Sequence, residues 1–224
     1  VVPILLISTK SENKHSVNLK PLSNKIDNYK LRNDLIRPEF ISLFFSFLAL
    51  ALAHGMIITH IIPLLIERNI PNAIQLFITA LIGPSQVVGR IIMIILQKQK
   101  FSINIISTLT FILKIVATIF LIYANNNIYL LILFVIFQGS GAGMTSIARP
   151  VVTANIMGYE RFGSVSGAMA VGYIGGSALS PIIGAQIWEW NSYDSMLRII
   201  SVILLMGFVS FIIALKINHN NKIN

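Results

Sequence analysis

The side chains best suited to binding chemistry are a few basic residues inside long apolar segments, above all Arg90, Arg149 and His54. A charged side chain in hydrocarbon costs several kcal/mol unless it faces protein or water. The planar guanidinium of arginine binds carboxylates and phosphates through paired hydrogen bonds. We therefore predict that Arg90 meets an anionic substrate. For both arginines, and above all for Arg149, the alternative is a side chain that reaches the interface or caps a helix end.

Two of the apolar segments carry polar and small residues at intervals of three or four, which places them along one face of a helix. The first stripe is Thr79, Gly83, Gln86 and Arg90, and the second is Gln138, Gly141, Thr145 and Arg149. Each stripe ends in an arginine, which predicts a water-filled cavity. The candidate substrate-binding residues are Arg90, Gln86, His54, Gln138 and Arg149.

Two histidines and one lysine also fall inside apolar segments. His54 lies near mid-depth, where it could donate to a substrate, and His60 lies about two turns nearer the outer face. The alternative for both is a hydrogen bond to a neighbouring helix. Lys114 is too far from either end of its segment to reach water easily, so it faces another helix or a local water defect.

The acidic residues exclude several kinds of function. All eight lie in the basic N-terminal region, in loops or at helix ends. No segment therefore has a buried carboxylate for a proton relay or a carboxylate pair for acid and base catalysis. Because cysteine is also absent, thiolate chemistry and disulfides are excluded. We predict no enzyme activity, no metal site and no cofactor.

Composition predicts the elements that position these residues. Only 11% of the residues are charged, against about 25% in soluble domains. Six apolar segments are each long enough to cross a bilayer as a helix. They run approximately over 40–66, 73–96, 102–123, 128–148, 164–188 and 195–215. The expected fold class is therefore an all-α integral membrane protein with six transmembrane helices.

Charge distribution predicts the organisation of the chain and its topology. Residues 1–38 hold the apolar end of a preceding helix followed by a basic linker, 39–216 the six-helix bundle, and 217–224 a tail. Lysine and arginine are concentrated in the linker, in alternate loops and in the tail, which places both termini in the cytoplasm. The net charge of +9 follows from this sorting, so we expect the lipid bilayer and no nucleic acid as a partner.

The fifth segment carries small residues at steps of four, namely Gly172, Gly176, Ser180 and Gly184. Such a ridge lets two helix backbones approach closely, so we predict a packing role for it. Three glycines of the fourth segment, Gly139, Gly141 and Gly143, are predicted instead to let that helix flex.

Several stretches resemble the second six-helix half of the major facilitator superfamily. The first hairpin of that half is similar to residues 60–65, 67–73 and 83–90. Residues 158–164 resemble the loop between its fourth and fifth helices, and residues 172–184 with Pro181 resemble its glycine-rich fifth helix. The similarity covers residues 37–215.

This resemblance implies one bundle of a facilitator-type fold, with two such bundles around a central site that opens alternately to each side. It implies that the third and sixth helices face lipid. The expected function is one half of a secondary transporter for a small organic solute, an anion being preferred, in the inner membrane. Its partner would be the missing N-terminal half or a second copy of the chain. The alternatives are a homodimeric six-helix permease and a non-transporting scaffold or degenerate remnant.

Overall fold

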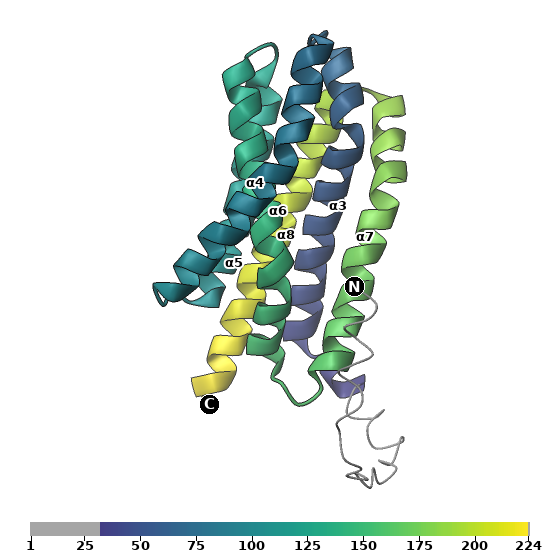
Figure 1. Ribbon diagram of the computed structural model, residues 1–224. Coiled ribbons are helices and arrows are strands. Elements are labelled where there is room, and N and C mark those ends of the chain that lie inside the picture. The colour runs from purple at the N-terminus through teal and green to yellow at the C-terminus, as the bar shows by residue number, and fades with distance from the viewer. Residues whose placement is uncertain (1–31, 224) are drawn as a thin grey trace, which may run out of the picture.

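A computed structural model describes residues 32–223, and this region contains six long helices (Figure 1). They are α3 (Pro38–Glu67), α4 (Asn72–Lys98), α5 (Ile103–Ala124), α6 (Ile128–Met157), α7 (Phe162–Trp190) and α8 (Tyr193–Ile223). All six are long and apolar enough to cross a membrane. The six predicted spans are thereby confirmed as helices. The proposed end of a preceding helix, and most of the basic linker, lie outside the described residues.

Two helices extend well beyond the predicted spans. The sequence pattern placed Pro150 in a loop, but α6 continues through it to Met157. A proline removes one hydrogen bond from a helix interior, and neighbouring helices in a membrane bundle compensate for that loss. In the same way α8 continues past the expected end at Leu215 to Ile223. Polar residues at both helix ends therefore belong to the bundle rather than to loops.

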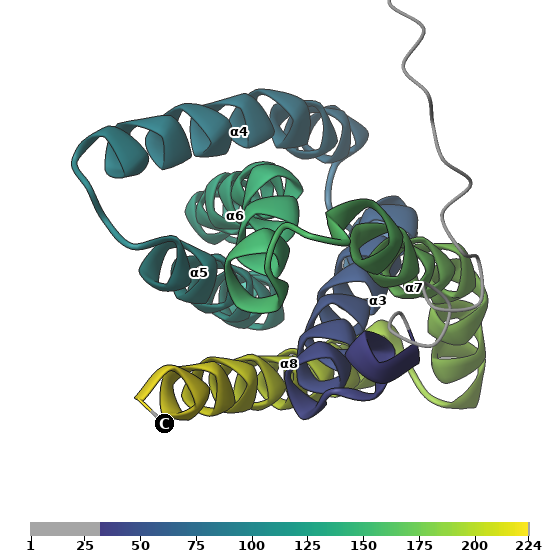
Figure 2. The same cartoon turned by 90° about the horizontal axis from the view of Figure 1, so that it is seen from below.

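The helices form two groups of three, each built around a central helix (Figure 2). Helix α3 packs between α7 and α8, and α6 packs between α4 and α5. The central helix of each group thus takes both neighbours from the other half of the chain. A further packing contact, between α5 and α8, joins the two groups. The three helices α3 to α5 therefore correspond in order to α6, α7 and α8.

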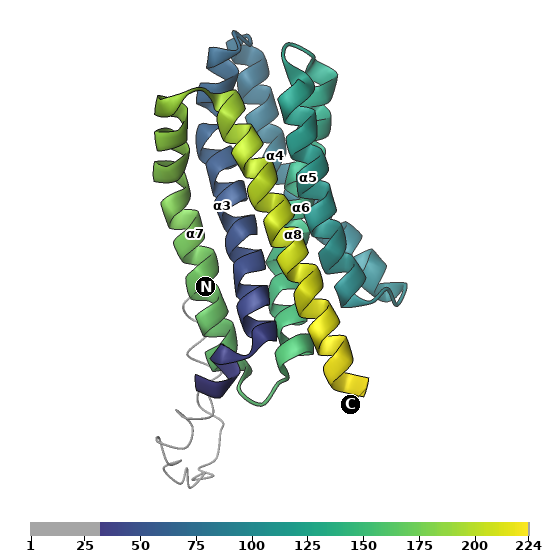
Figure 3. The same ribbon diagram turned by 180° about the vertical axis from the view of Figure 1, so that it is seen from behind.

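Equivalent helices of the two sets run in opposite directions. Successive helices alternate in direction along the chain, so α3 and α6 are antiparallel (Figure 1). The start of α3 and the end of α8 lie at the same end of the bundle (Figure 3). The correspondence between the sets is therefore an inverted repeat, with α3 and α6 as equivalent central helices.

Glycines bring α7 onto α3. A Cβ atom placed on Gly172 would lie 2.4 Å from the ring of Phe44, and one on Gly176 would lie 2.8 Å from Leu48 Cδ1. From the other helix, a Cβ on Gly55 would lie 1.9 Å from Ser180 Oγ. The ridge predicted on the fifth segment is therefore confirmed as a helix packing surface.

The equivalent pair, α4 and α6, uses glycines in the same way. A Cβ on Gly89 would lie 2.2 Å from the carbonyl oxygen of Ser140, and one on Gly143 would lie 2.0 Å from that of Gln86. Gly139 and Gly143 are buried against α4, and the hypothesis that the glycines of α6 let this helix flex stays a prediction. Close glycine packing is thus repeated in both halves of the bundle.

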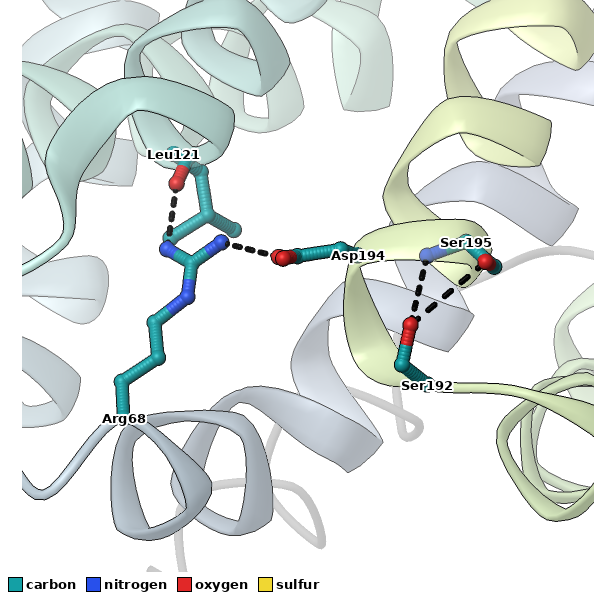
Figure 4. A network of polar contacts seen from close by, with 5 residues as sticks. All are labelled: Arg68, Leu121, Ser192, Asp194 and Ser195. Atoms are coloured by element: carbon teal, nitrogen blue, oxygen red, sulfur yellow. Dashed lines mark hydrogen bonds and ion pairs between the residues drawn. The ribbon is translucent and has the colours of Figure 1, made fainter.

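Ion pairs and hydrogen bonds fasten the two ends of the bundle. At one end, Arg68 Nη1 donates to the carbonyl oxygen of Leu121 at 2.6 Å, and its Nη2 pairs with Asp194 at 2.7 Å (Figure 4). At the other end, Arg161 Nε donates to Asp34 at 2.7 Å. The first contact ties the α3–α4 loop to α5 and α8, and the second ties the α6–α7 loop to the segment before α3.

Candidate functional site

Three helices meet at a polar cluster inside the apolar bundle. His54 comes from α3, Lys114 from α5 and Gln138 from α6. Gln138 Nε2 donates to His54 Nδ1 at 3.3 Å. Lys114 packs against α6 about one turn from Gln138, because a Cβ placed on Gly141 would lie 3.1 Å from Lys114 Cγ. We call these three residues the central cluster.

Lys114 is enclosed by the packing of α5 on α6. Its side chain belongs to a buried polar stripe on α5 that also includes Ser107, Thr110 and Thr118. A Cβ placed on Gly141 would lie only 3.1 Å from Lys114 Cγ, so the glycine provides room for the lysine stem. The prediction that Lys114 faces another helix is confirmed, and a lipid-facing role for the whole of α5 is not compatible with this stripe.

Two polar atoms of the central cluster have no hydrogen-bond partner among residues 32–223. They are Nζ of Lys114 and Oε1 of Gln138. Both residues are almost fully buried, with relative exposures of 2% and 1%. A buried polar atom without a partner loses its hydration with no compensating bond, and the loss is largest for a charged group. The cluster is therefore polar but incomplete.

No described carboxylate lies near mid-depth to neutralise Lys114. The acidic residues of the described region stand before α3, in a loop, or within two residues of a helix end. They are Asp34, Glu39, Glu67, Glu160, Glu189 and Asp194. A positive charge inside the bundle thus has no anionic partner from this part of the chain.

Arg149 does not reach the end of its helix. It stands eight residues before the last residue of α6, and its guanidinium carbon lies 4.2 Å from the ring centroid of Tyr173 on α7. Its Nη1 is buried without a hydrogen-bond partner in the described region. The alternative that Arg149 caps a helix end is therefore wrong, because α6 extends past Pro150 to Met157. The side chain instead stacks between α6 and α7.

The polar stripe predicted on α4, which ends in Arg90, lies outside the central cluster. Arg90 and Gly83 are exposed, while Gln86 and Thr79 are half-buried. Arg90 makes no hydrogen bond or ion pair with any described residue. Of the five predicted site residues, the structure brings together His54 and Gln138, but leaves Arg90, Gln86 and Arg149 outside the central cluster.

His60 has a structural role. Its Nε2 lies 3.0 Å from the carbonyl oxygen of Pro181 on α7, and its ring centroid is 5.8 Å from that of Tyr193. Pro181 is inside α7, and a backbone carbonyl oxygen has a second lone pair that can accept a bond from a side chain. The alternative of a histidine bonded to a neighbouring helix is confirmed for His60, and for His54 through its bond to Gln138.

Lys114 is the member of the central cluster that was not among the predicted site residues. Its signal in the sequence was a lysine in the middle of an apolar segment, flanked by Ser107, Thr110 and Thr118 on one helix face. No protein-family model matches this chain, and no curated protein matches it.

Proposed function

We propose that this chain is the C-terminal six-helix half of a secondary transporter of the major facilitator type. It moves a small organic solute, preferably an anion, across the inner membrane by alternating access. The site residues are those of the central cluster together with Arg90, Gln86 and Arg149. The role is transport, with no chemical conversion of the solute.

The observation that carries this proposal is the inverted repeat, in which α3 packs between α7 and α8 and α6 packs between α4 and α5. Transporters of this type contain inverted repeats of three helices within each half, and their binding sites lie near mid-depth at the repeat interface. The bond between His54 of α3 and Gln138 of α6 supports this proposal, because it joins the two three-helix repeats. A scaffold has no need for polar side chains at that depth.

The exposed faces of α4 and α7 favour a partner bundle. A Cβ placed on Gly83 of α4, or on Gly167 or Gly175 of α7, would meet nothing within 4 Å. Arg90 is exposed on α4 as well. A guanidinium at this depth is costly against lipid tails, but it is acceptable against water in a cavity. We infer that another six-helix bundle, the N-terminal half or a second copy, faces α4 and α7 across that cavity.

Counterflow measures this function directly. Membrane vesicles from cells that make the chain, and from matched cells that lack it, are loaded with one unlabelled solute and exposed to the same labelled solute. The probes are acetate, lactate, succinate, phosphate, glucose and ethanolamine. We expect the loaded vesicles to take up at least one labelled anion faster when the chain is present. Equal uptake of all six probes in both kinds of vesicle would favour the scaffold or remnant.

A further inference from the structure

We propose that the central cluster binds a small hydroxycarboxylate. The Lys114 ammonium pairs with the carboxylate, and Oε1 of Gln138 accepts a hydrogen bond from the hydroxyl group. The place of this site in transport rests on the proposed function, whereas binding itself can be measured without it.

The buried and unpaired ammonium group of Lys114 indicates that the ligand is an anion. Its Nζ is buried and has no described partner, and the described acidic residues lie near the helix ends. A buried cation is stabilised when an anion joins it, since a close pair in a region of low dielectric attracts strongly. A ligand carboxylate would provide the charge that the surrounding helices do not.

A monoanion fits better than a dianion. One ammonium neutralises one negative charge, and the nearest arginine along α6 is Arg149, eleven residues from Gln138. That separation is about 16 Å along a helix, too far for both groups to hold one small ligand. A second carboxylate or a doubly charged phosphate would therefore be left without a partner.

The unpaired Oε1 of Gln138 indicates that the ligand carries a hydroxyl group. Its amide nitrogen already donates to His54, and its buried Oε1 lacks a donor in the described region. A carboxylate has no hydrogen to give, so the ligand needs a second group that donates. An ammonium group would be repelled by Lys114, which excludes amino acids. A neutral hydroxyl close to the carboxylate satisfies both atoms.

The burial of the three cluster residues limits the size of the ligand and its access to the site. Lys114 and Gln138 are buried and His54 is half-buried, so His54 is the most exposed member of the central cluster. A Cβ placed on Gly141 would lie 3.1 Å from Lys114 Cγ, so the lysine stem fills the space beside this glycine. The ligand must be small, and lactate is one of the small compounds with both required groups.

Binding of lactate to the purified 224-residue chain in lipid nanodiscs tests this inference. Calorimetric titrations use sodium lactate, acetate, alaninate and phosphate at constant ionic strength. We expect lactate to bind about tenfold more tightly than acetate, as one hydrogen bond of about 1.4 kcal/mol provides, and alanine and phosphate to bind more weakly than acetate. Lys114→Met should weaken lactate binding at least tenfold. Gln138→Leu should bind lactate and acetate alike.

The matched control is Lys216→Met, which removes an exposed lysine from α8 and should bind lactate as the unaltered chain does. The inference is overturned if Lys114→Met, folded by circular dichroism, binds lactate unchanged, or if the unaltered chain binds none of the four compounds. If lactate binds as expected but shows no counterflow in vesicles, the binding site stands and the transport function fails.

Discussion

The side-chain amide of Gln138 lies 3.3 Å from Nδ1 of His54, and this bond joins the central helices of the two helix groups. It is the polar contact at the pseudo-symmetric centre of the bundle. Its two ends come from opposite members of the inverted repeat.

This bond should contribute measurably to stability. We expect His54→Leu to lower the free energy of unfolding by about 1 kcal/mol, because the buried amide of Gln138 then loses its partner. The double variant His54→Leu with Gln138→Leu should recover much of that loss, since no polar group stays unpaired. Unfolding in nanodiscs, followed by tryptophan fluorescence, measures both changes. Additive losses in the double variant would show that the two side chains do not interact.

Lys114 should be unfavourable for the stability of the ligand-free bundle. Replacing a buried ionic group by an apolar residue of similar volume is often neutral or stabilising by about 1–4 kcal/mol. We expect Lys114→Met to unfold at a higher temperature than the unaltered chain. Lys216→Met, at an exposed position, should change the free energy of unfolding by less than about 0.5 kcal/mol. A lower unfolding temperature for Lys114→Met would mean that the lysine is well paired without a ligand.

A glycine inside a helix interface and a glycine outside any interface allow a matched comparison. A Cβ on Gly143 would lie 2.0 Å from the backbone oxygen of Gln86, whereas one on Gly175 would meet nothing within 4 Å. Gly143→Ala must push α4 away from α6, so we expect it to cost about 1–3 kcal/mol. Gly175→Ala should be neutral or slightly stabilising, because alanine favours helices.

Size-exclusion chromatography in detergent, with unfolding curves of the two purified variants, measures this difference. Similar stability for both alanine variants would argue against the close packing of α4 and α6. The interface between α4 and α6 would then not be equivalent to the glycine-packed interface between α3 and α7.

Hydropathy alone was enough to predict six spans, because each span needs about 20 apolar residues and little else. It did not predict the extent of α6, since Pro150 breaks helices in water but is tolerated inside a membrane bundle. The ridge on α7 was visible because four small residues recur at steps of four. The glycines between α4 and α6 were harder to interpret, because Gly89 and Gly143 come from different helices and gain meaning only when these pack together.

The candidate site was partly predictable for a related reason. A polar residue at mid-depth stands out in an apolar sequence, which identified His54 and Gln138. Their distance depends on how α3 and α6 pack, and no pattern within one helix contains that information. The sequence predicts no binding role for Lys114, and the resemblance places its helix against lipid.

Topology is tested by cysteine labelling, which suits a chain that has no cysteine of its own. The bundle puts the start of α3 and the end of α8 at one end, and the excess of lysine and arginine predicts that this end is cytoplasmic. In intact cells, Asn126→Cys in the α5–α6 loop should react with an impermeant maleimide, and Asn220→Cys near the end of α8 should not. The reverse pattern would invert the orientation.

Arg90 is the residue whose role depends most on the proposed cavity. It is exposed on α4, eight residues or about 12 Å before the end of that helix, and it pairs with no described carboxylate. We expect its charge to draw anions into the cavity towards the central cluster. Lysine keeps the charge but loses the planar pair of donors, whereas glutamine loses the charge. In vesicles with equal amounts of protein, Arg90→Lys should therefore reduce counterflow of lactate, and Arg90→Gln should nearly abolish it. Normal counterflow in the glutamine variant would make Arg90 an interfacial anchor and would leave anion selectivity to Lys114.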